Sequence, residues 1–124
     1  MASDPTAKAH ELEKRRTFVL CRHVLFARGL STLLRGREEI EVVGIESEEL
    51  SGLESIKNLK PDVVVVERGA QGVPIDNVLS HVVRESPGST VVGLSLGENE
   101  IDVYHGHQRQ VRRAEDLLDL ISEL

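Results

Sequence analysis

Four chemically capable side chains stand at or near the ends of apolar runs in this 124-residue chain. Cys21 and Arg22 follow the first run, Glu67 follows four consecutive valines, and Ser95 comes near the end of a later run. A thiol can act as a nucleophile, a guanidinium can bind an anion, and a carboxylate can hold a hard metal ion. Whether these groups work together depends on the elements that position them.

The chain alternates strand-like apolar runs with segments of helical periodicity as far as residue 96. The expected strands are Thr17–Cys21, Ile40–Ile45, Asp62–Glu67 and Thr90–Leu96. Each strand-to-strand connection is long enough for a crossover helix, which predicts parallel pairing with right-handed crossovers. The sequence therefore predicts an α/β fold with a doubly wound, flavodoxin-like parallel sheet. The carboxyl ends of such strands meet at one crevice, so Cys21, Arg22, Glu67 and Ser95 are expected there.

The predicted helices each carry one apolar face. Ser47 is expected to cap the second helix, and a Gly-rich loop is expected over Arg68–Gly72. The apolar faces comprise Phe26, Leu30, Leu33 and Leu34 on the first helix, Leu50, Leu53, Ile56 and Leu59 on the second, and Ile75, Val78, Leu79, Val82 and Val83 on the third.

The two ends of the chain depart from this alternation. Residues 1–16 are polar and are predicted to be a flexible arm, so that 17–124 forms a single domain. After a turn at Gly97–Glu100, the alternation in Ile101–His105 and the Gly106-His107 link predict an antiparallel β-meander. A closing helix is expected over Arg113–Leu124, with Leu117, Leu118, Ile121 and Leu124 inward.

Composition excludes several classes of function. A net charge of -6 argues against a nucleic-acid partner, and no apolar run is long enough to span a bilayer. One cysteine excludes a disulfide framework and suits a reducing, cytoplasmic setting. His105 and His107 lack neighbouring Cys or acidic ligands, so no metal site is expected there.

The segment Val19–Leu30 resembles the first strand and helix of response-regulator receiver domains, of the kind usually joined to a helix-turn-helix output domain. The receiver pattern has two acids after the strand, then His, Pro, Leu, Phe, Arg, Glu, Gly and Leu. The matching residues here are His23, Leu25, Phe26, Gly29 and Leu30, whereas Cys21 and Arg22 replace the two acids and Val24 replaces the proline. The resemblance covers roughly residues 17–96.

The resemblance implies a phosphorylation site that has lost its charges. Glu67 stands where receivers carry the phosphoryl-accepting aspartate, and Ser95 stands at the position of the hydroxyl that senses the acyl phosphate. The segment after Leu96 is too short for a receiver's fourth helix and its fifth strand, which carries a lysine, so the meander is predicted to replace them. The formal charge of the acidic cluster moves from about -3 to about zero, which leaves little to bind Mg²⁺. No cofactor and no phosphorylation are therefore expected.

Three readings of the strand-end residues stay open at this point. Glu67 mimics a phosphorylated state and pairs with Arg22, or both are solvated charges beside an empty pocket. Alternatively, Cys21, Arg22 and Ser95 line a small-ligand or anion site, or an enzyme site. A phosphatase-like loop is not supported, because the spacing from Cys21 to Arg28 and the apolar residues between them cannot form an anion-binding nest.

The favoured function is therefore a pseudo-receiver, a non-enzymatic signalling module of a two-component type that binds other proteins. Receivers transmit their signal through the region that the meander occupies here, and an exposed β-edge can pair with another chain, which predicts a homodimer. The candidate contact surface comprises Ile101, Val103, Tyr104, His105, Arg109, Val111, Arg112 and Arg113.

Overall fold

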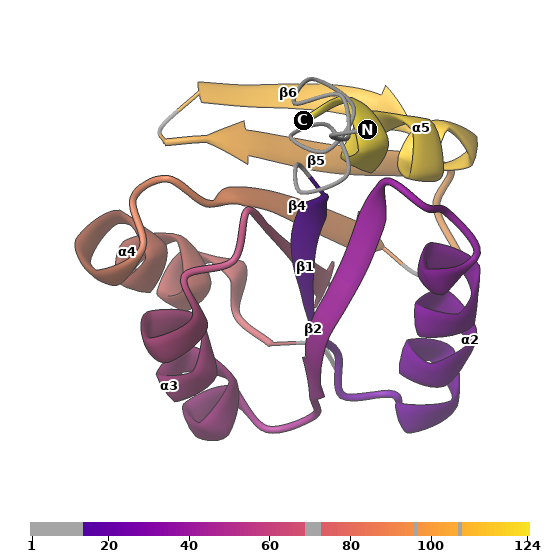
Figure 1. Cartoon of the computed structure of the whole chain (residues 1–124). Coiled ribbons are helices and arrows are strands. Elements are labelled where there is room, and N and C mark those ends of the chain that lie inside the picture. The colour runs from indigo at the N-terminus through magenta and orange to yellow at the C-terminus, as the bar shows by residue number, and fades with distance from the viewer. Residues whose placement is uncertain (1–13, 69–72, 96, 107) are drawn as a thin grey trace, which may run out of the picture.

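The computed structural model describes residues 14–68, 73–95, 97–106 and 108–124, and the first thirteen residues of the predicted arm lie outside this part. Six strands form one sheet of order β2-β1-β3-β4-β5-β6 (Figure 1). The strands are β1 (Arg15–Leu20), β2 (Ile40–Glu46), β3 (Val63–Arg68), β4 (Thr90–Ser95), β5 (Glu100–His105) and β6 (Gln108–Arg113). The helices are α2 (Val24–Arg35), α3 (Glu49–Leu59), α4 (Ile75–Glu85), the short 3-10 turn η1 (Ala114–Asp116) and α5 (Leu117–Glu123).

The sheet is mixed. Strands β1 to β4 pair in parallel, as the alternation of strands and helices predicted. Strands β5 and β6 each pair antiparallel with the strand before them, with Gly93 opposite Asp102 and Tyr104 opposite Arg109. The predicted α/β class is confirmed as a receiver-like mixed sheet, while the idea that β5 and β6 stand in for a receiver helix and strand stays a prediction.

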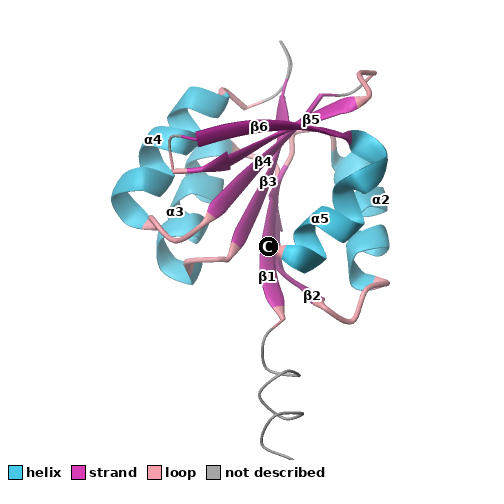
Figure 2. Cartoon of the chain, turned by 90° about the horizontal axis from the view of Figure 1, so that it is seen from above, coloured by secondary structure: helices cyan, strands magenta, loops and turns pink. Residues whose placement is uncertain are grey.

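Helices cover both faces of the sheet (Figure 2). Helices α2 and α5 lie on one face, and α3 and α4 lie on the other. The valines of β3 alternate between the two faces, because successive side chains of a strand point in opposite directions. Val63 and Val65 join the core beneath α2 and α5, whereas Val64 and Val66 join the core beneath α3 and α4.

Two element boundaries were predicted wrongly. Strand β1 begins at Arg15, because Arg15 and Arg16 pair with Ile40 and Glu41 of β2 instead of belonging to the arm. The last helix does not begin at Arg113, because Arg113 pairs with Glu100 in the sheet. Backbone pairing with a neighbouring strand decided both boundaries, and local sequence does not reveal such pairing.

Several residues predicted to lie on buried helix faces are exposed. Leu33 exposes 60% of its surface and Leu50 exposes 82%, since α2 and α3 each turn a narrower stripe to the sheet than predicted. Leu120, which was not predicted to point inward, is buried with Ile121 in α5.

Ser47 is not the cap of α3, because Glu48 takes that position and its side chain makes no capping hydrogen bond. None of the described helices is long and apolar enough to cross a membrane.

The two glycines inside helices have opposite surroundings. A Cβ atom at Gly52 in α3 would lie 2.5 Å from Cδ1 of Leu20 in β1, whereas a Cβ atom at Gly29 in α2 would meet nothing within 4 Å. Gly52 is therefore required for the close approach of α3 to the sheet.

We expect Gly29→Ala to stabilise the protein by about 0.5–1 kcal/mol, because alanine is the better helix former. We expect Gly52→Ala to destabilise it by about 1–3 kcal/mol, because Leu20 must move to admit the methyl group. Urea denaturation of both variants checks this pair. Equal stabilisation by the two substitutions would show that α3 does not pack as closely as the structure has it.

Candidate functional site

The carboxylate of Glu67 lies buried at the end of β3. Only 1% of this residue is exposed, and its side chain points to the same face as Val63 and Val65, toward the start of α2. A buried carboxylate is costly unless hydrogen bonds or an opposite charge compensate it. The surroundings of this group therefore determine what the site can do.

Both oxygen atoms of Glu67 are engaged by the loop that joins β1 to α2. Oε1 accepts a hydrogen bond of 3.1 Å from the backbone N–H of Arg22 and a longer one of 3.5 Å from the thiol of Cys21. Oε2 contacts Nδ1 of His23 in a close ion-pair geometry. Since an ionised carboxylate only accepts hydrogen bonds, Nδ1 of His23 carries the proton when Glu67 is charged.

His23 occupies the N-cap position of α2, yet its side chain makes no hydrogen bond to the helix. Its backbone carbonyl accepts the first helical bond from Ala27, at 2.9 Å, and its ring is turned toward Glu67 instead. The carboxylate thus lies close to the N-terminus of α2, where the positive end of the helix dipole favours a negative charge.

Cys21 is buried beside the same carboxylate, with 1% of its surface exposed. Burial, together with the negative charge of Glu67, raises the pKa of the Cys21 thiol to about 11, and hydrogen bonding with the backbone of His23 opposes this only in part. A thiol that stays protonated and inaccessible is a poor nucleophile. Cys21 is therefore a structural residue in this site.

The structure corrects the predicted pairing of Arg22 with Glu67. Arg22 contributes its backbone N–H, and its exposed guanidinium makes no ion pair with Glu67 among the residues that the structure describes. The reading of two solvated charges is also wrong for Glu67, which is buried. His23 supplies the side-chain partner, and sequence reasoning missed this role because the receiver pattern assigns that position to the framework.

Ser95 is not among the hydrogen-bond partners of Glu67 in the described part of the chain. It ends β4 one residue beyond Leu94, which is the register partner of Glu67. Within the described residues, no group of three or more His, Cys, Asp and Glu side chains has an arrangement that could hold a metal ion. The hydrogen bonds around Glu67 tie β3 to the β1–α2 loop and leave no free carboxylate oxygen.

A second ionic cluster joins three strands, and the sequence did not predict it. Asp102 of β5 forms an ion pair with Arg68 of β3. It also accepts a hydrogen bond of 2.9 Å from Nε of Arg109 of β6, whose Nη2 lies 2.7 Å from the same carboxylate oxygen in an ion pair. Arg68 crosses β4 at Gly93, where a Cβ atom would lie 2.7 Å from Cδ of Arg68. Arg68 is the last residue of β3 and not the first residue of the predicted Gly-rich loop, whose other residues, 69–72, lie outside the described part of the chain. The one signal in the sequence was Gly93 within strand β4, because a glycine inside a strand can mark a place where another group passes close to the backbone.

The predicted contact surface is only partly exposed. Ile101 and Val103 are buried at 1% and 0%, because α5 covers their side of β5, so these two residues were wrongly assigned to the surface. Tyr104 is half-buried, and His105 is exposed with its ring 3.2 Å from the hydroxyl of Thr90. The exposed members on β6 are Arg109, Val111, Arg112 and Arg113.

Comparison with known proteins supports the receiver resemblance. The signal receiver domain of the response regulator NarL from Mycobacterium tuberculosis superposes with a TM-score of 0.62 and 28% identity, covering 69% of each chain. RcsB from Salmonella enterica serovar Typhimurium, solved bound to promoter rprA with the phosphomimetic BeF3-, shares the fold at a TM-score of 0.58 and 16% identity, over 69% of this chain and 44% of that one.

Two curated relatives match a similar length of sequence. The protein-glutamate methylesterase/protein-glutamine glutaminase of Lawsonia intracellularis is 32% identical over 81 residues, which is 65% of this chain. A second protein of that name from Methanosarcina mazei is 30% identical over 88 residues, which is 71% of this chain. The chain spans about a quarter of the length of these relatives, at 23% and 24%. No protein-family model matches the sequence.

The chain is thus a receiver-like α/β protein. It resembles response-regulator receiver domains in fold, and it is also similar in sequence to the NarL receiver. The resemblance to these proteins supports a regulatory role in signalling.

The raised pKa of Cys21 has a measurable consequence for stability. As the pH rises from the ordinary thiol value of 9.0 toward about 11, the unfolded chain loses the thiol proton while the folded protein keeps it. The free energy of unfolding should therefore fall across this range, and this contribution should be absent from Cys21→Ala. Urea denaturation of both proteins between pH 8 and 11, compared by difference, checks this. If the free energy of unfolding changes with pH in the same way for both proteins, burial does not hold the thiol protonated.

Proposed function

We propose that this chain is a receiver-like signalling module that does not accept phosphate and acts by binding other protein chains through β5 and β6. The claim that the chain does not accept phosphate rests on one observation: Arg22, Cys21 and His23 engage both carboxylate oxygens of Glu67. A phosphoryl acceptor needs a free oxygen, and phosphoryl transfer needs a cation to neutralise the developing charge. Glu67 offers no free oxygen, and the two preceding acids of the receiver pattern are Cys21 and Arg22.

The same contacts support a module that is held in one state. In a switch, a strand-end group must exchange partners between two arrangements. Here the buried carboxylate of Glu67 is matched by groups that all lie in one loop, and removal of any of them leaves part of the charge uncompensated. This favours a constant structure at the end of β3.

The exposed hairpin of β5 and β6 supports the second half of the proposal. Every residue of β6 is exposed, and β6 is the last strand of the sheet. An edge strand offers unpaired backbone groups to another chain, and a second copy of this protein is one such chain. Three of the six side chains on β6 are arginines, so a basic edge would meet its own like charges in a homodimer.

We expect that restoring acids will restore cation binding. The triple variant Cys21→Asp, Arg22→Asp, Glu67→Asp should gain a rise in melting temperature of several degrees in Mg²⁺, because carboxylates then converge at the strand ends. The unaltered protein should show no Mg²⁺ response and no gain of a phosphoryl group by mass spectrometry after treatment with acetyl phosphate. A phosphorylated unaltered protein would sink the proposal.

Self-association through β6 should depend on salt in an unusual direction. Higher ionic strength screens the arginines, so a dimer paired along β6 should become tighter as salt is added. At low salt, Arg112→Glu should make the β6-paired dimer tighter, because it removes part of the repulsion between the arginines. Arg35→Glu, on helix α2, should leave the dimer affinity unchanged. Sedimentation velocity over a range of concentrations measures this. A monomer at every salt concentration would exclude the homodimer and leave only other partners.

A further inference from the structure

The face of the sheet that carries α3 and α4 is incompletely covered. On this face α4 is the last helix in the described part of the chain, and the strands beyond it, β5 and β6, lie without one (Figures 1 and 2). The side chains that point there are Asp102 and Tyr104 of β5 and their register partners Val111 and Arg109 of β6. In layered α/β folds such a sheet face is normally covered by helices.

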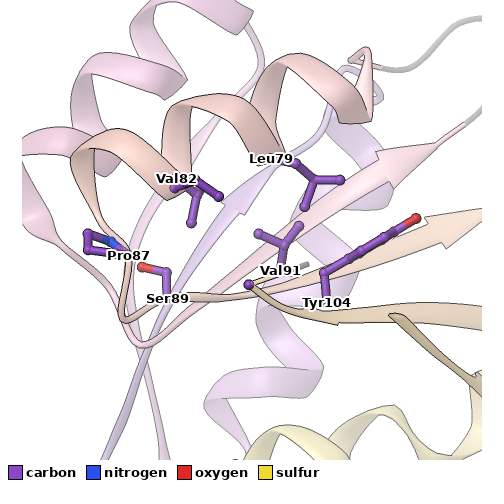
Figure 3. A pocket seen from close by; sticks show the side chains of 8 residues that line it. Leu79, Val82, Pro87, Ser89, Val91 and Tyr104 are labelled. Carbon is purple, nitrogen blue, oxygen red and sulfur yellow. The ribbon is translucent and has the colours of Figure 1, made fainter. Parts of the chain in front are cut away.

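An apolar pocket lies at the border between α4 and this open face. Figure 3 shows Leu79 and Val82 of α4 above Val91 of β4 and Tyr104 of β5, with Pro87 and Ser89 at one end. Its volume is about 160 Å³. An apolar cavity of roughly 150 Å³ is large enough for benzene, so the pocket has room for one leucine or aromatic side chain.

Exposed valines lie at the rim of the pocket and farther out on the same sheet face, where Val111 is the register partner of Asp102. Val83, which also lines the pocket, is 39% exposed, and Val111 on the same face of β6 is 48% exposed. We call this surface the α4–β6 groove; it comprises the pocket residues Leu79, Val82, Val83, Val91 and Tyr104 and, beyond the Asp102–Arg109 ion pair, Val111.

One wall of the α4–β6 groove is basic. Asp102 is a single carboxylate held between the guanidiniums of Arg68 and Arg109, so this cluster carries one positive charge in excess. The side chain of Arg109 is 55% exposed and faces the groove side of the sheet. This local charge contrasts with the net charge of -6 of the whole chain, and complementary charge fixes the orientation and choice of a partner.

We propose that the α4–β6 groove binds an amphipathic, acidic helix of another protein. Such a helix would lie beside α4 as the next member of the layer, insert one leucine or aromatic side chain into the pocket, and place carboxylates against Arg109. The inference rests on the proposed function and adds the class of partner. A second copy is the competing occupant, because its α3 exposes Leu50 together with Glu54, and the test below distinguishes it from another protein.

The test is a titration of the isotope-labelled protein with two synthetic helical peptides, followed by amide chemical shifts. Both peptides have leucines at i, i+3, i+4 and i+7; one has glutamates on the flanking positions and the other has lysines. The glutamate peptide should bind at least tenfold more tightly, shift amides of α4, β5 and β6, and weaken as salt is added. Equal binding of the two peptides, or shifts confined to other elements, would overturn the proposal.

Two variants and a control locate the binding. Val83→Lys fills the mouth of the groove at an exposed helix position and should reduce affinity at least tenfold, while Arg109→Glu should reverse the preference between the peptides. Arg35→Glu, on α2, should change neither. Val83 lies on α4 and not on β6. If Val83→Lys leaves the affinity for the glutamate peptide unchanged, the groove is rejected as the binding site, while self-association along β6 is not tested by this variant. Shifts in the groove that depend on protein concentration without peptide would assign it to a second copy and overturn the proposal.

Discussion

The buried carboxylate of Glu67 is the constraint on which the strand-end region depends. A charge with 1% exposure persists in a folded protein only where its surroundings compensate it. The β1–α2 loop does this with the N–H of Arg22, the thiol of Cys21 and the ring of His23. The loop is therefore shaped around Glu67, and even the N-cap side chain of α2 is used for that purpose and not for the helix.

A second constraint holds the antiparallel strands to the parallel sheet. Asp102 is 7% exposed and sits between two guanidiniums, one from β3 and one from β6. The contact reaches across β4 only because Gly93 has no side chain there. An uncompensated Asp102 would be expensive at this depth, so Arg68 and Arg109 fix the register of β5 and β6 against the rest of the sheet.

Hydrophobic periodicity was enough to predict the α/β class, the parallel pairing of the first four strands and the two antiparallel turns, because these follow from repeating patterns along the chain. The direction of individual side chains was not predictable in the same way. Ile101 and Val103 alternate as a strand requires, but only the position of α5 decides that they face inward. Likewise, the roles of His23 and Arg22 depend on where α2 begins, and the link from Arg68 to Asp102 depends on pairing between distant strands.

The two constrained regions lie on opposite faces of the sheet, and this bears on regulation. Glu67 points toward α2 with Val63 and Val65, whereas Asp102 and Tyr104 point toward α4 with Val64 and Val66. Coupling between two sites requires an element with two arrangements that both sites bias. Glu67 is held by contacts within one loop, and the Asp102 cluster is held across three strands, so neither provides such an element. This construction agrees with the proposal of a module that is held in one state.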